Sequence, residues 1–218
     1  MAPRVGLDRA AVMRAAVEIL DEQGVPGLTY SALAARLGVK YQSLYSHVGT
    51  PQDLARELHI SYLRSLGETT RAAAVGLAGR DALRAIALAY WEHGLANPGL
   101  LALHLNQGVR DPALAESLAD AASALFTVLS TYGITGDELW HWRRAFAAAC
   151  HGFTSFEHAG VLRRTPSPRA TLELVVDALV DRLEKTARER TREAARAAPS
   201  GRQPRQRSPR ARAGSARR

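Results

Sequence analysis

The sequence predicts an all-α protein in which a small N-terminal helix-turn-helix domain of three helices precedes a larger helical bundle. Ala, Leu and Arg dominate its 218 residues and β-branched and aromatic residues are sparse, a composition that favours helices. Apolar residues recur every three or four positions in segments separated by short Gly and Pro breaks, as in amphipathic helices. The chain is long enough for one small and one larger domain. We expect these domains at residues 1–50 and 51–198, followed by a disordered Arg-rich tail at residues 199–218.

The first helix is expected to support the two that follow it. Asp8 is placed to cap this helix, which runs to Glu22, and Gly24 ends it. The short Val-Pro-Gly loop at residues 25–27 then turns the chain.

Residues 28–48 predict two short helices joined by a tight turn. Thr29 can cap the first of them, and Leu33 and Leu37 lie four positions apart on one of its faces. Gly38 forms the turn, because only Gly takes a left-handed φ without a Cβ penalty. This pattern is typical of a helix-turn-helix.

The second short helix, at about residues 40–48, is expected to direct a polar surface outward. Leu44 and Val48 lie four positions apart and should pack inward. The polar side chains that remain free to reach another molecule are Lys40, Gln42, Ser43, Ser46 and His47. Helix-turn-helix proteins place the N-terminal residues of such a helix against base edges in the major groove of DNA. We therefore predict a DNA-binding surface here.

Three side chains at the start of this helix suit particular contacts on DNA. Gln42 can form a bidentate pair with adenine, Lys40 favours guanine or a phosphate, and Tyr41 can touch a thymine methyl group or a phosphate. Tyr41 and Tyr45 also fit the apolar spacing of the helix. The sequence therefore leaves open whether one of the two tyrosines belongs to the core instead.

Four ordered motifs lie in this stretch: Leu28-Thr29, Leu33-Ala34, Leu37-Gly38-Val39 and Leu44-Tyr45-Ser46-His47. This set resembles the signature of the TetR/AcrR family of bacterial transcriptional regulators. The resemblance implies base contacts at Tyr41 and Gln42, with Lys40 at the start of the helix. The phosphate contacts that it implies are at Thr29, Ser31, Tyr45 and His47. One departure is Pro51, because many members have at this position a Lys that contacts a phosphate.

A fourth helix is expected to leave this domain and enter the next one. Thr50 and Asp53 form a capping-box pattern with Pro51 at the first helical position, and helical spacing continues to about Ala74. Because this helix belongs to both domains, it can couple them. The sequence also allows the simpler interpretation that it only connects them.

Five further helical segments make up the predicted second domain. Their expected ranges are residues 81–95, 98–105, 112–132, 137–160 and 168–197. Pieces such as Ala89-Tyr90-Trp91 and His151-Gly152-Phe153 also resemble a recurring C-terminal domain type of the same family. The resemblance implies a domain that senses a small-molecule effector and forms dimers.

The last two helices contain the predicted dimer interface. A narrow seam of coiled-coil type is indicated by the alternating spacings of Leu172, Val176, Leu179 and Leu183. Small and aromatic residues that permit close approach are Gly152, Phe153, Phe156 and Gly160. In family members the last two helices of each subunit form a four-helix interface, and the resemblance implies the same here. The alternative is that the seam packs only within its own subunit.

A helical sensor domain needs an internal cavity built from inward side chains. The candidates for ligand contact are Tyr90, Trp91, His104, Phe126, Phe146 and Cys150. A metal site is not expected, since His151 and His158 are seven residues apart, roughly 10 Å along a helix. The sequence lacks a Gly-x-Ser-x-Gly elbow, a phosphate-binding Gly loop and a His-Glu-x-x-His motif. We therefore predict no enzyme activity, no cofactor and no metal.

The net charge of +8 comes almost entirely from the C-terminal end. Residues 199–218 contain seven Arg and no acidic residue, which leaves 22 basic and 21 acidic residues in the rest of the chain. Arg36 and Lys40 give the DNA-binding stretch a modest positive charge. A single cysteine excludes an intramolecular disulfide, and no segment resembles a secretion signal or a membrane span. We expect a soluble, cytoplasmic protein with no membrane partner.

These observations predict a ligand-responsive transcriptional repressor. It is expected to bind a near-palindromic double-stranded DNA operator as a homodimer and to respond to an unidentified small-molecule effector. The alternative is a helical small-molecule binding protein that has lost specific DNA binding. The missing Lys at Pro51 and the nearly neutral body favour this alternative, and binding to the protein's own upstream DNA distinguishes the two.

Overall fold

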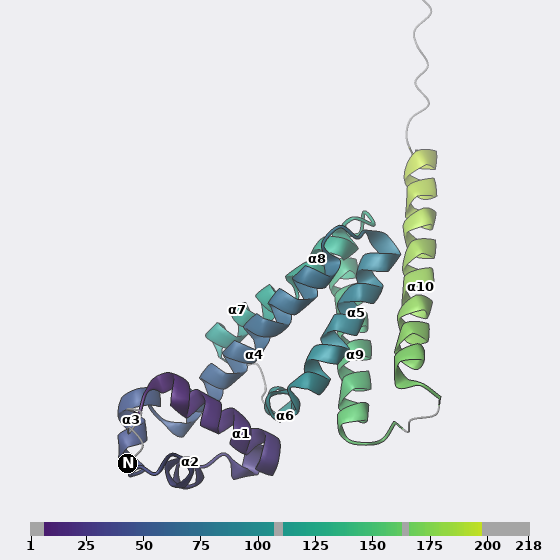
Figure 1. The fold of residues 1–218 in the computed structure, drawn as a ribbon. Coiled ribbons are helices and arrows are strands. Elements are labelled where there is room, and N and C mark those ends of the chain that lie inside the picture. Colours follow the sequence, from purple (N-terminus) through teal and green to yellow (C-terminus); the bar gives the residue numbers. More distant parts are fainter. Residues whose placement is uncertain (1–6, 107–110, 163–165, 198–218) are drawn as a thin grey trace, which may run out of the picture.

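The computed structural model describes residues 7–106, 111–162 and 166–197, and in these ranges every regular element is a helix (Figure 1). In chain order the helices are α1 (Arg9–Gly27), α2 (Tyr30–Leu37), α3 (Gln42–Val48), α4 (Pro51–Ala74), α5 (Gly79–Ala96), α6 (Pro98–Asn106), α7 (Pro112–Ala121), α8 (Ser123–Ser130), α9 (Gly136–His158) and α10 (Pro168–Ala197). The predicted all-α fold is confirmed. The predicted Arg-rich tail at residues 199–218 lies outside the described residues.

Helices α1–α3 form a three-helix unit at one end of the molecule (Figure 1). Its core includes Val12 and Ile19 of α1, Leu33 of α2 and Leu44 of α3, all of which are fully buried. Gly24 breaks the helical geometry of α1 with a φ of 69°, as predicted, and one further turn follows it. The apolar faces that the spacing predicts are thus the faces that meet.

Helix α4 runs from this unit into the second bundle (Figure 1). The predicted capping box is present: the Thr50 hydroxyl accepts from the Asp53 N–H at 3.2 Å, and the Asp53 carboxylate accepts from the Thr50 N–H at 2.9 Å. Leu54 and Leu58 complete the core of α1–α3, whereas Leu66 packs in a separate cluster with α6 and α7. A single helix therefore contributes to both cores.

Helix α6 is seated directly on α1. The Gly99 N–H donates a hydrogen bond to the Asp21 side chain at 2.8 Å. A Cβ on residue 99 would lie 2.6 Å from the backbone of residue 21, so this close approach requires Gly. Further along α6, Leu103 is buried in the core of α1–α3 and Leu101 in the cluster with α4. Like α4, α6 joins the two parts of the molecule.

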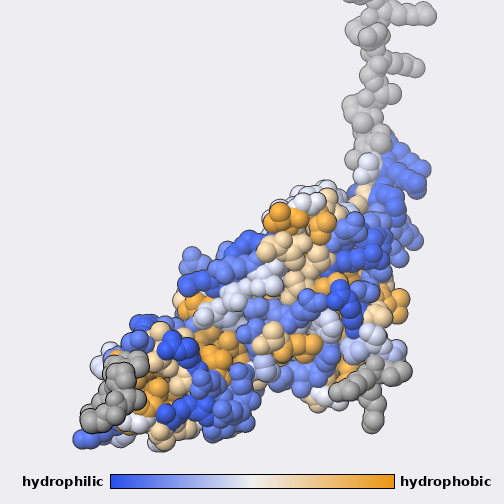
Figure 2. Space-filling model, in the orientation of Figure 1, coloured by the Kyte–Doolittle hydropathy of each residue, from blue (hydrophilic) through white to orange (hydrophobic). Residues whose placement is uncertain are grey.

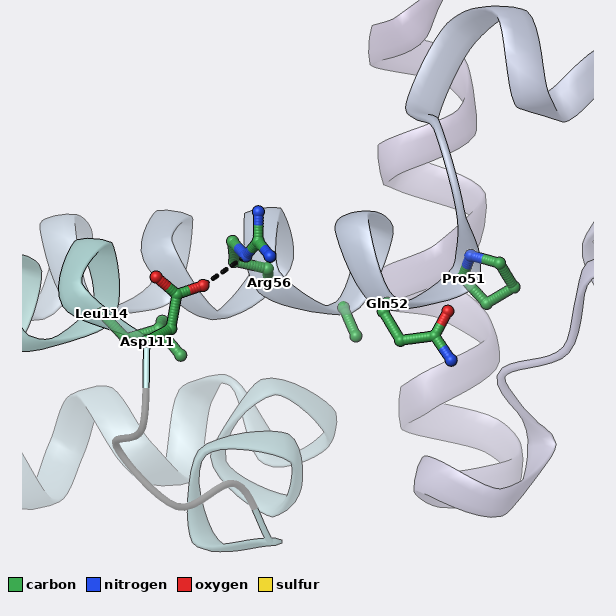
Figure 3. Close-up of a pocket in the computed structure, with 6 residues that line it drawn as sticks. Pro51, Gln52, Arg56, Asp111 and Leu114 are labelled. Atoms are coloured by element: carbon green, nitrogen blue, oxygen red, sulfur yellow. Dashed lines mark ion pairs between the residues drawn. The ribbon is translucent and has the colours of Figure 1, made fainter.

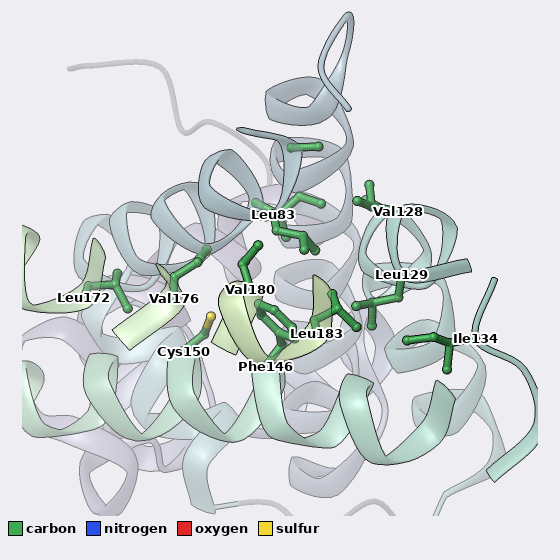
Figure 4. Close-up of a cluster of buried hydrophobic side chains, with 14 residues drawn as sticks. Leu83, Val128, Leu129, Ile134, Phe146, Cys150, Leu172, Val176, Val180 and Leu183 are labelled. Atoms are coloured by element: carbon green, nitrogen blue, oxygen red, sulfur yellow. The ribbon is translucent and has the colours of Figure 1, made fainter. Parts of the chain in front are cut away.

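The largest core lies between α5, α8, α9 and α10 (Figure 4). Phe146 and Cys150 of α9 lie beside the apolar side of α10 in this core. The prediction that the α10 seam faces a partner subunit is wrong for Leu172, Val176 and Leu183, which are buried within one chain. The spacing of the seam is as predicted, but α5 and α9 of the same subunit cover it. Beyond this core the C-terminal end of α10 is hydrophilic (Figure 2).

The segment predicted as one helix at residues 112–132 is two helices, α7 and α8, bent by 51°. Gly67 of α4 allows the bend to pack closely, because a Cβ there would lie 3.0 Å from the Ala121 Cα. Arg71 of α4 donates to the Asp120 carbonyl and to the Ser123 hydroxyl on the two sides of the bend, at 3.1 and 3.2 Å. Contacts with α4 therefore stabilise a break that no Gly or Pro marks. No described helix by itself is long and apolar enough to cross a membrane, and only the bent pair of α7 and α8 reaches that length and composition.

Candidate functional site

The turn between α2 and α3 forms as the sequence predicts. Thr29 caps α2 by accepting a hydrogen bond from a backbone N–H three residues on, at 3.1 Å. Gly38 ends α2 in the left-handed conformation, with a φ of 66°. Leu44 and Val48 of α3 are buried, and α3 begins at Gln42, two residues later than expected. The polar side of α3 is therefore directed outward.

Both tyrosines that the spacing left open are largely exposed. The exposed fraction is 49% for Tyr41 and 48% for Tyr45, so neither belongs to the core. Tyr45 packs edge-on against Tyr30, with ring centroids 5.1 Å apart, and the Tyr30 hydroxyl donates to the Gly49 carbonyl at 2.8 Å. Tyr30, to which the sequence assigned no role, thus links α2 to the end of α3.

The other residues predicted to contact DNA belong to the same two helices and the turn between them. Ser31, Lys40, Gln42 and Ser43 are exposed, whereas His47 is half-buried. Hydroxyl, amide and ammonium groups are thereby available at one end of the molecule, where they can contact bases and phosphates.

The positive charge of this surface is smaller than the sequence suggests. Arg36 forms ion pairs with Glu22 and Glu18 of α1, the latter at 3.1 Å. The hydrogen bond from Arg36 lowers the pKa of the Glu22 carboxyl group. Arg36 therefore braces α2 against α1, and Lys40 is left as the exposed cation on the turn.

A shallow groove of about 360 Å³ lies where α4 begins (Figure 3). Its lining includes Pro51 and Gln52, and it ends at an ion pair between Arg56 of α4 and Asp111, which caps α7, with 2.5 Å between nitrogen and oxygen. Because these charges neutralise each other, the groove offers no free charged group to a ligand. The ion pair instead fastens the N-terminal end of α4 to the second bundle.

A more enclosed cavity of about 420 Å³ lies between α4, α5, α6, α7, α8 and α9. Four of the six residues predicted to contact a ligand line it: Tyr90, His104, Phe146 and Cys150. Most of the remaining lining is aliphatic, with leucine, isoleucine and alanine side chains from several helices. A cavity of this size and character suits a small apolar molecule.

Two of the predicted ligand residues lie elsewhere. Trp91 packs against the main core, and its indole N–H donates to the Glu157 carboxylate at 2.5 Å. Phe126 packs edge-on against Trp140, with ring centroids 4.9 Å apart. Phe126 nevertheless contacts a cavity residue, because the guanidinium of Arg143 lies 5.3 Å from the centre of its ring.

One wall of the cavity is polar but uncharged. His104 shares a hydrogen bond of 2.7 Å with His59, and its ring lies 5.2 Å from that of His151. The hydroxyl of Tyr90 lies 2.8 Å from Nδ1 of His151. Burial, helped by the two neighbouring histidines, lowers the pKa of His104 to about 3, and burial also lowers the pKa of His151. These rings are therefore neutral near pH 7.

Cys150 is a structural rather than a reactive cysteine. Its side chain is buried, and burial raises the pKa of the thiol to about 12. A thiol is nucleophilic only as the thiolate, so Cys150 contributes an apolar surface to the cavity at neutral pH. Within the described ranges, no three His, Cys, Asp or Glu side chains are grouped so that they could hold a metal ion.

The outward surfaces of α9 and α10 include part of the predicted dimer interface. Phe156 is 57% exposed and Gly160 is also exposed, whereas Phe153 packs partly into the core. A Cβ on Gly152 would meet no atom within 4 Å, so the surface above it is open. On α10 the exposed apolar residue is Leu174, at 69%, while Leu179 is half-buried against the core.

Sequence reasoning missed several residues around the cavity. Arg143 lines it and was not considered, because arginine in an amphipathic helix usually lies in solvent. His59 and Tyr62 of α4 were also missed, although both are almost completely buried beside His104. A polar residue at a core position of a helix is a signal for such a cluster, and α4 carries three of them, His59, Tyr62 and Thr70.

The chain is similar in sequence and in fold to known transcriptional regulators. Residues 83–179 match the family model of a "Tetracyclin repressor-like, C-terminal domain". The chain is 32% identical over 158 residues to the uncharacterized HTH-type transcriptional regulator Rv0681 of Mycobacterium tuberculosis, covering 72% of each protein. It is 31% identical over 156 residues to the HTH-type transcriptional regulator YobS of Bacillus subtilis, covering 71% of this chain and 81% of the relative. A TetR variant from Acinetobacter baumannii in complex with minocycline is similar in fold, with a TM-score of 0.65, 22% identity and coverage of 83% of this chain and 98% of that one.

Proposed function

Because the chain belongs to the TetR/AcrR family of transcriptional regulators, we propose that it is a ligand-responsive repressor that binds a near-palindromic operator as a homodimer in the cytoplasm. TetR-family regulators bind DNA operators as dimers with small-molecule effectors. The observation that carries the proposal is the start of α3, where Tyr41 and Gln42 stand exposed on a short helix whose other side is buried.

On this proposal α3 enters the major groove. Gln42 pairs with an adenine, Tyr41 contacts a thymine methyl group, and Lys40 reaches guanine or a phosphate. The contacts that fix the position of the domain on the DNA backbone come from Thr29, Ser31, Tyr45 and His47. Ser43 is also exposed and within the same turn of helix as Gln42, so it completes the surface.

The proposed dimer joins the outward surfaces of α9 and α10 of two subunits. The exposed apolar side chains of Phe156 and Leu174 would then be buried, and the open surface above Gly152 would accept a partner helix. A two-fold axis between the subunits sets two α3 helices at a fixed separation. The half-sites of the operator are then about one helical turn of DNA apart, roughly 34–36 Å, or a multiple of it.

The proposed coupling between cavity and DNA runs through α4 and α6. Each helix has buried residues in the core of α1–α3, such as Leu58 and Leu103, and others that line the cavity, such as Thr70 and His104. A molecule that fills the cavity and prefers a different arrangement of these helices changes the spacing of the two α3 helices. The effector then lowers operator affinity, and the operator lowers effector affinity by the same factor.

A mobility-shift titration at a stated salt concentration tests the proposal. The wild-type protein is titrated into a duplex from its own upstream region and into a shuffled duplex of equal length and composition. We expect saturable binding of the upstream duplex at least about tenfold tighter than of the shuffled one, since specific sites exceed non-specific ones by more than this. Equal affinity for the two duplexes would contradict a regulatory function.

A second candidate function has one observation in its favour. The ion pairs of Arg36 and the exposed Pro51 leave few cations on the proposed DNA surface. A small-molecule binding protein without an operator would therefore keep the cavity and lose the DNA affinity. In the same titration it would bind neither duplex tightly while still binding an apolar probe.

A further inference from the structure

The cavity combines a large apolar surface with one charged side chain. Its aliphatic and aromatic lining includes Leu66, Ile86, Leu118, Leu125 and Phe146, contributed by five different helices. Arg143 is the charged residue among those that line it. A molecule that fits this cavity therefore needs an apolar body and one place where it meets a guanidinium.

The guanidinium of Arg143 has no carboxylate partner among the described residues. Its Nε is buried without any hydrogen-bond acceptor, while its central carbon lies 5.3 Å from the ring centres of both Phe126 and Trp140. Burial, and after it the repulsion of the neighbouring Arg144, lower the pKa of Arg143. Both rings lie within cation–π distance of the guanidinium, but neither offers an oxygen acceptor to its N–H groups.

Other half-buried arginines of this protein do have acidic partners. Arg84 donates to Asp177 from two nitrogens, each at 2.5 Å, and Arg80 donates to Asp181 at 2.5 Å. Arg71, at the bend of α7 and α8, likewise pairs with Asp120 at 3.1 Å. Against this pattern, the arginine that faces the cavity is left without an anion, although buried polar groups are normally paired.

The other polar side chains that line the cavity already have hydrogen-bond partners; the buried hydroxyl of Tyr62 lacks one, but Tyr62 lies beside His104 outside the lining. The Thr70 hydroxyl donates to carbonyls of its own helix, at 3.0 Å to Leu66, and Tyr90 and His151 bond to each other at 2.8 Å. His104 is bonded to His59. Arg143 is therefore the group whose donors a ligand can satisfy.

We propose that the effector of this protein is an amphipathic organic anion, whose apolar body fills the cavity and whose carboxylate or comparable anionic group accepts hydrogen bonds from Arg143. This inference deepens the proposed function, because it names the chemical class of the effector. Trp140 is 47% exposed beside the guanidinium, so the anionic end of the ligand lies toward the mouth of the cavity and its apolar end lies inside. A neutral apolar molecule would leave the guanidinium unpaired and bind less well than its size predicts.

Two fluorescent probes that differ by one anionic group test the proposal. The probes are 8-anilinonaphthalene-1-sulfonate and N-phenyl-1-naphthylamine, which share the same aromatic body and differ by the sulfonate. Both are titrated into the full-length wild-type protein, R143Q and R144Q. The control R144Q removes an exposed arginine at the next position of α9, outside the cavity lining.

We expect R143Q to lose about 10- to 100-fold in affinity for the sulfonate, the range for a hydrogen bond to a charged group, and to bind the neutral probe within about twofold of wild type. R144Q should match wild type for both probes. Retained binding of the neutral probe shows that the cavity of R143Q is intact. An equal loss for the two probes, or equal losses of sulfonate affinity in R143Q and R144Q, overturns the proposal.

A measurement on the wild-type protein alone does not depend on how the variant folds. Decanoate and 1-decanol compete with bound N-phenyl-1-naphthylamine at pH 7.5. We expect decanoate to displace the probe at the lower concentration although decanol is more apolar, and the opposite order overturns the proposal. Neither experiment contains DNA. If the protein prefers the anions but does not bind its upstream duplex specifically, only the proposed regulatory function is refuted. If the protein binds its operator but does not prefer the anions, only the proposed anion site is refuted.

Discussion

The α2–α3 surface and the cavity differ in how their polar side chains are placed relative to solvent. On α2 and α3 most polar side chains are exposed, and the buried side consists of apolar residues such as Leu33 and Leu44 together with Tyr30. Among the residues that line the cavity, Tyr90, His104 and His151 are half-buried and have hydrogen-bond partners within the protein, whereas Arg143 is the charged one. A change on the first surface should therefore alter binding without altering stability. A change at a cavity residue that also belongs to a core, such as Phe146 or Cys150, should alter both.

The largest effect is expected for Phe146→Ala. The side chain is 1% exposed, belongs to the main core and lines the cavity, so its loss leaves a void where packing is dense. We expect the free energy of unfolding to fall by about 3–5 kcal/mol, measured by urea denaturation. The response to an effector should change as well. A loss below about 1 kcal/mol, comparable to that of an exposed residue, would mean that the cavity wall is not part of the core.

Leu174→Glu and Leu172→Glu separate the two sides of α10. Leu174 is 69% exposed and Leu172 is fully buried, although the two residues are neighbours along one helix. Leu174→Glu should keep the fold and weaken the proposed dimer by about 2–5 kcal/mol, as an unpaired charge in an interface does. Leu172→Glu should unfold the bundle instead. Sedimentation that still shows a dimer of Leu174→Glu would move the interface away from this surface.

Gln42→Ala tests the exposed surface. We expect specific operator affinity to fall by about 1–3 kcal/mol and preference at one base pair of each half-site to relax, if the contact is bidentate. The thermal midpoint should stay unchanged, because Gln42 is exposed. Tyr41→Ala should behave similarly, since Tyr41 is half in solvent. If operator and random DNA are weakened equally, Gln42 does not read bases.

The smallest expected effect concerns pH. The pKa of His104 is lowered to about 3 in the folded protein, against about 6.5 in an unfolded chain, so below pH 6.5 the unfolded state binds more protons. Stability from this group is thus present above pH 6.5 and lost as the pH falls toward 3. Between pH 7.5 and 5.5 we expect a loss of about 1 kcal/mol, measured by urea denaturation. His104→Gln should reduce this dependence and His158→Gln, at an exposed residue, should not; an unchanged pH profile in His104→Gln would contradict the neutral polar wall.

Local sequence signals determine the α1–α3 unit and the start of α4. The cap at Thr29, the turn at Gly38 and the capping box at Thr50 need only neighbours in sequence, and each forms as predicted. The break between α7 and α8 has no such signal, because Arg71 and Gly67 of α4 stabilise it from far along the chain. The position of this break therefore depends on tertiary contacts, which the local sequence pattern does not show.

The same limit applies to the seam of α10 and to the cavity. Spacing shows that Leu172 and Val176 share a face, but it does not show whether a helix of the same subunit or of a partner covers that face. From the sequence alone, Arg143 is expected on the surface. Only the folded structure shows that its neighbours are the rings of Phe126 and Trp140 and not a carboxylate. Four of the six predicted ligand residues line the cavity because aromatic and polar residues on helices that pack together converge there.

The most direct measurement is whether ligand binding in the cavity and operator binding at the proposed α2–α3 surface affect each other. The affinity for 8-anilinonaphthalene-1-sulfonate is measured with and without saturating operator duplex, and the affinity for the operator is measured with and without the saturating probe, all at one salt concentration. If α4 and α6 couple the two sites, each ligand weakens the binding of the other by the same factor. R143Q, which is expected to bind the probe poorly, should then show little change in operator affinity at the same probe concentration. If the two ligands bind the wild-type protein together with unchanged affinities, α4 and α6 do not couple the cavity to the DNA surface.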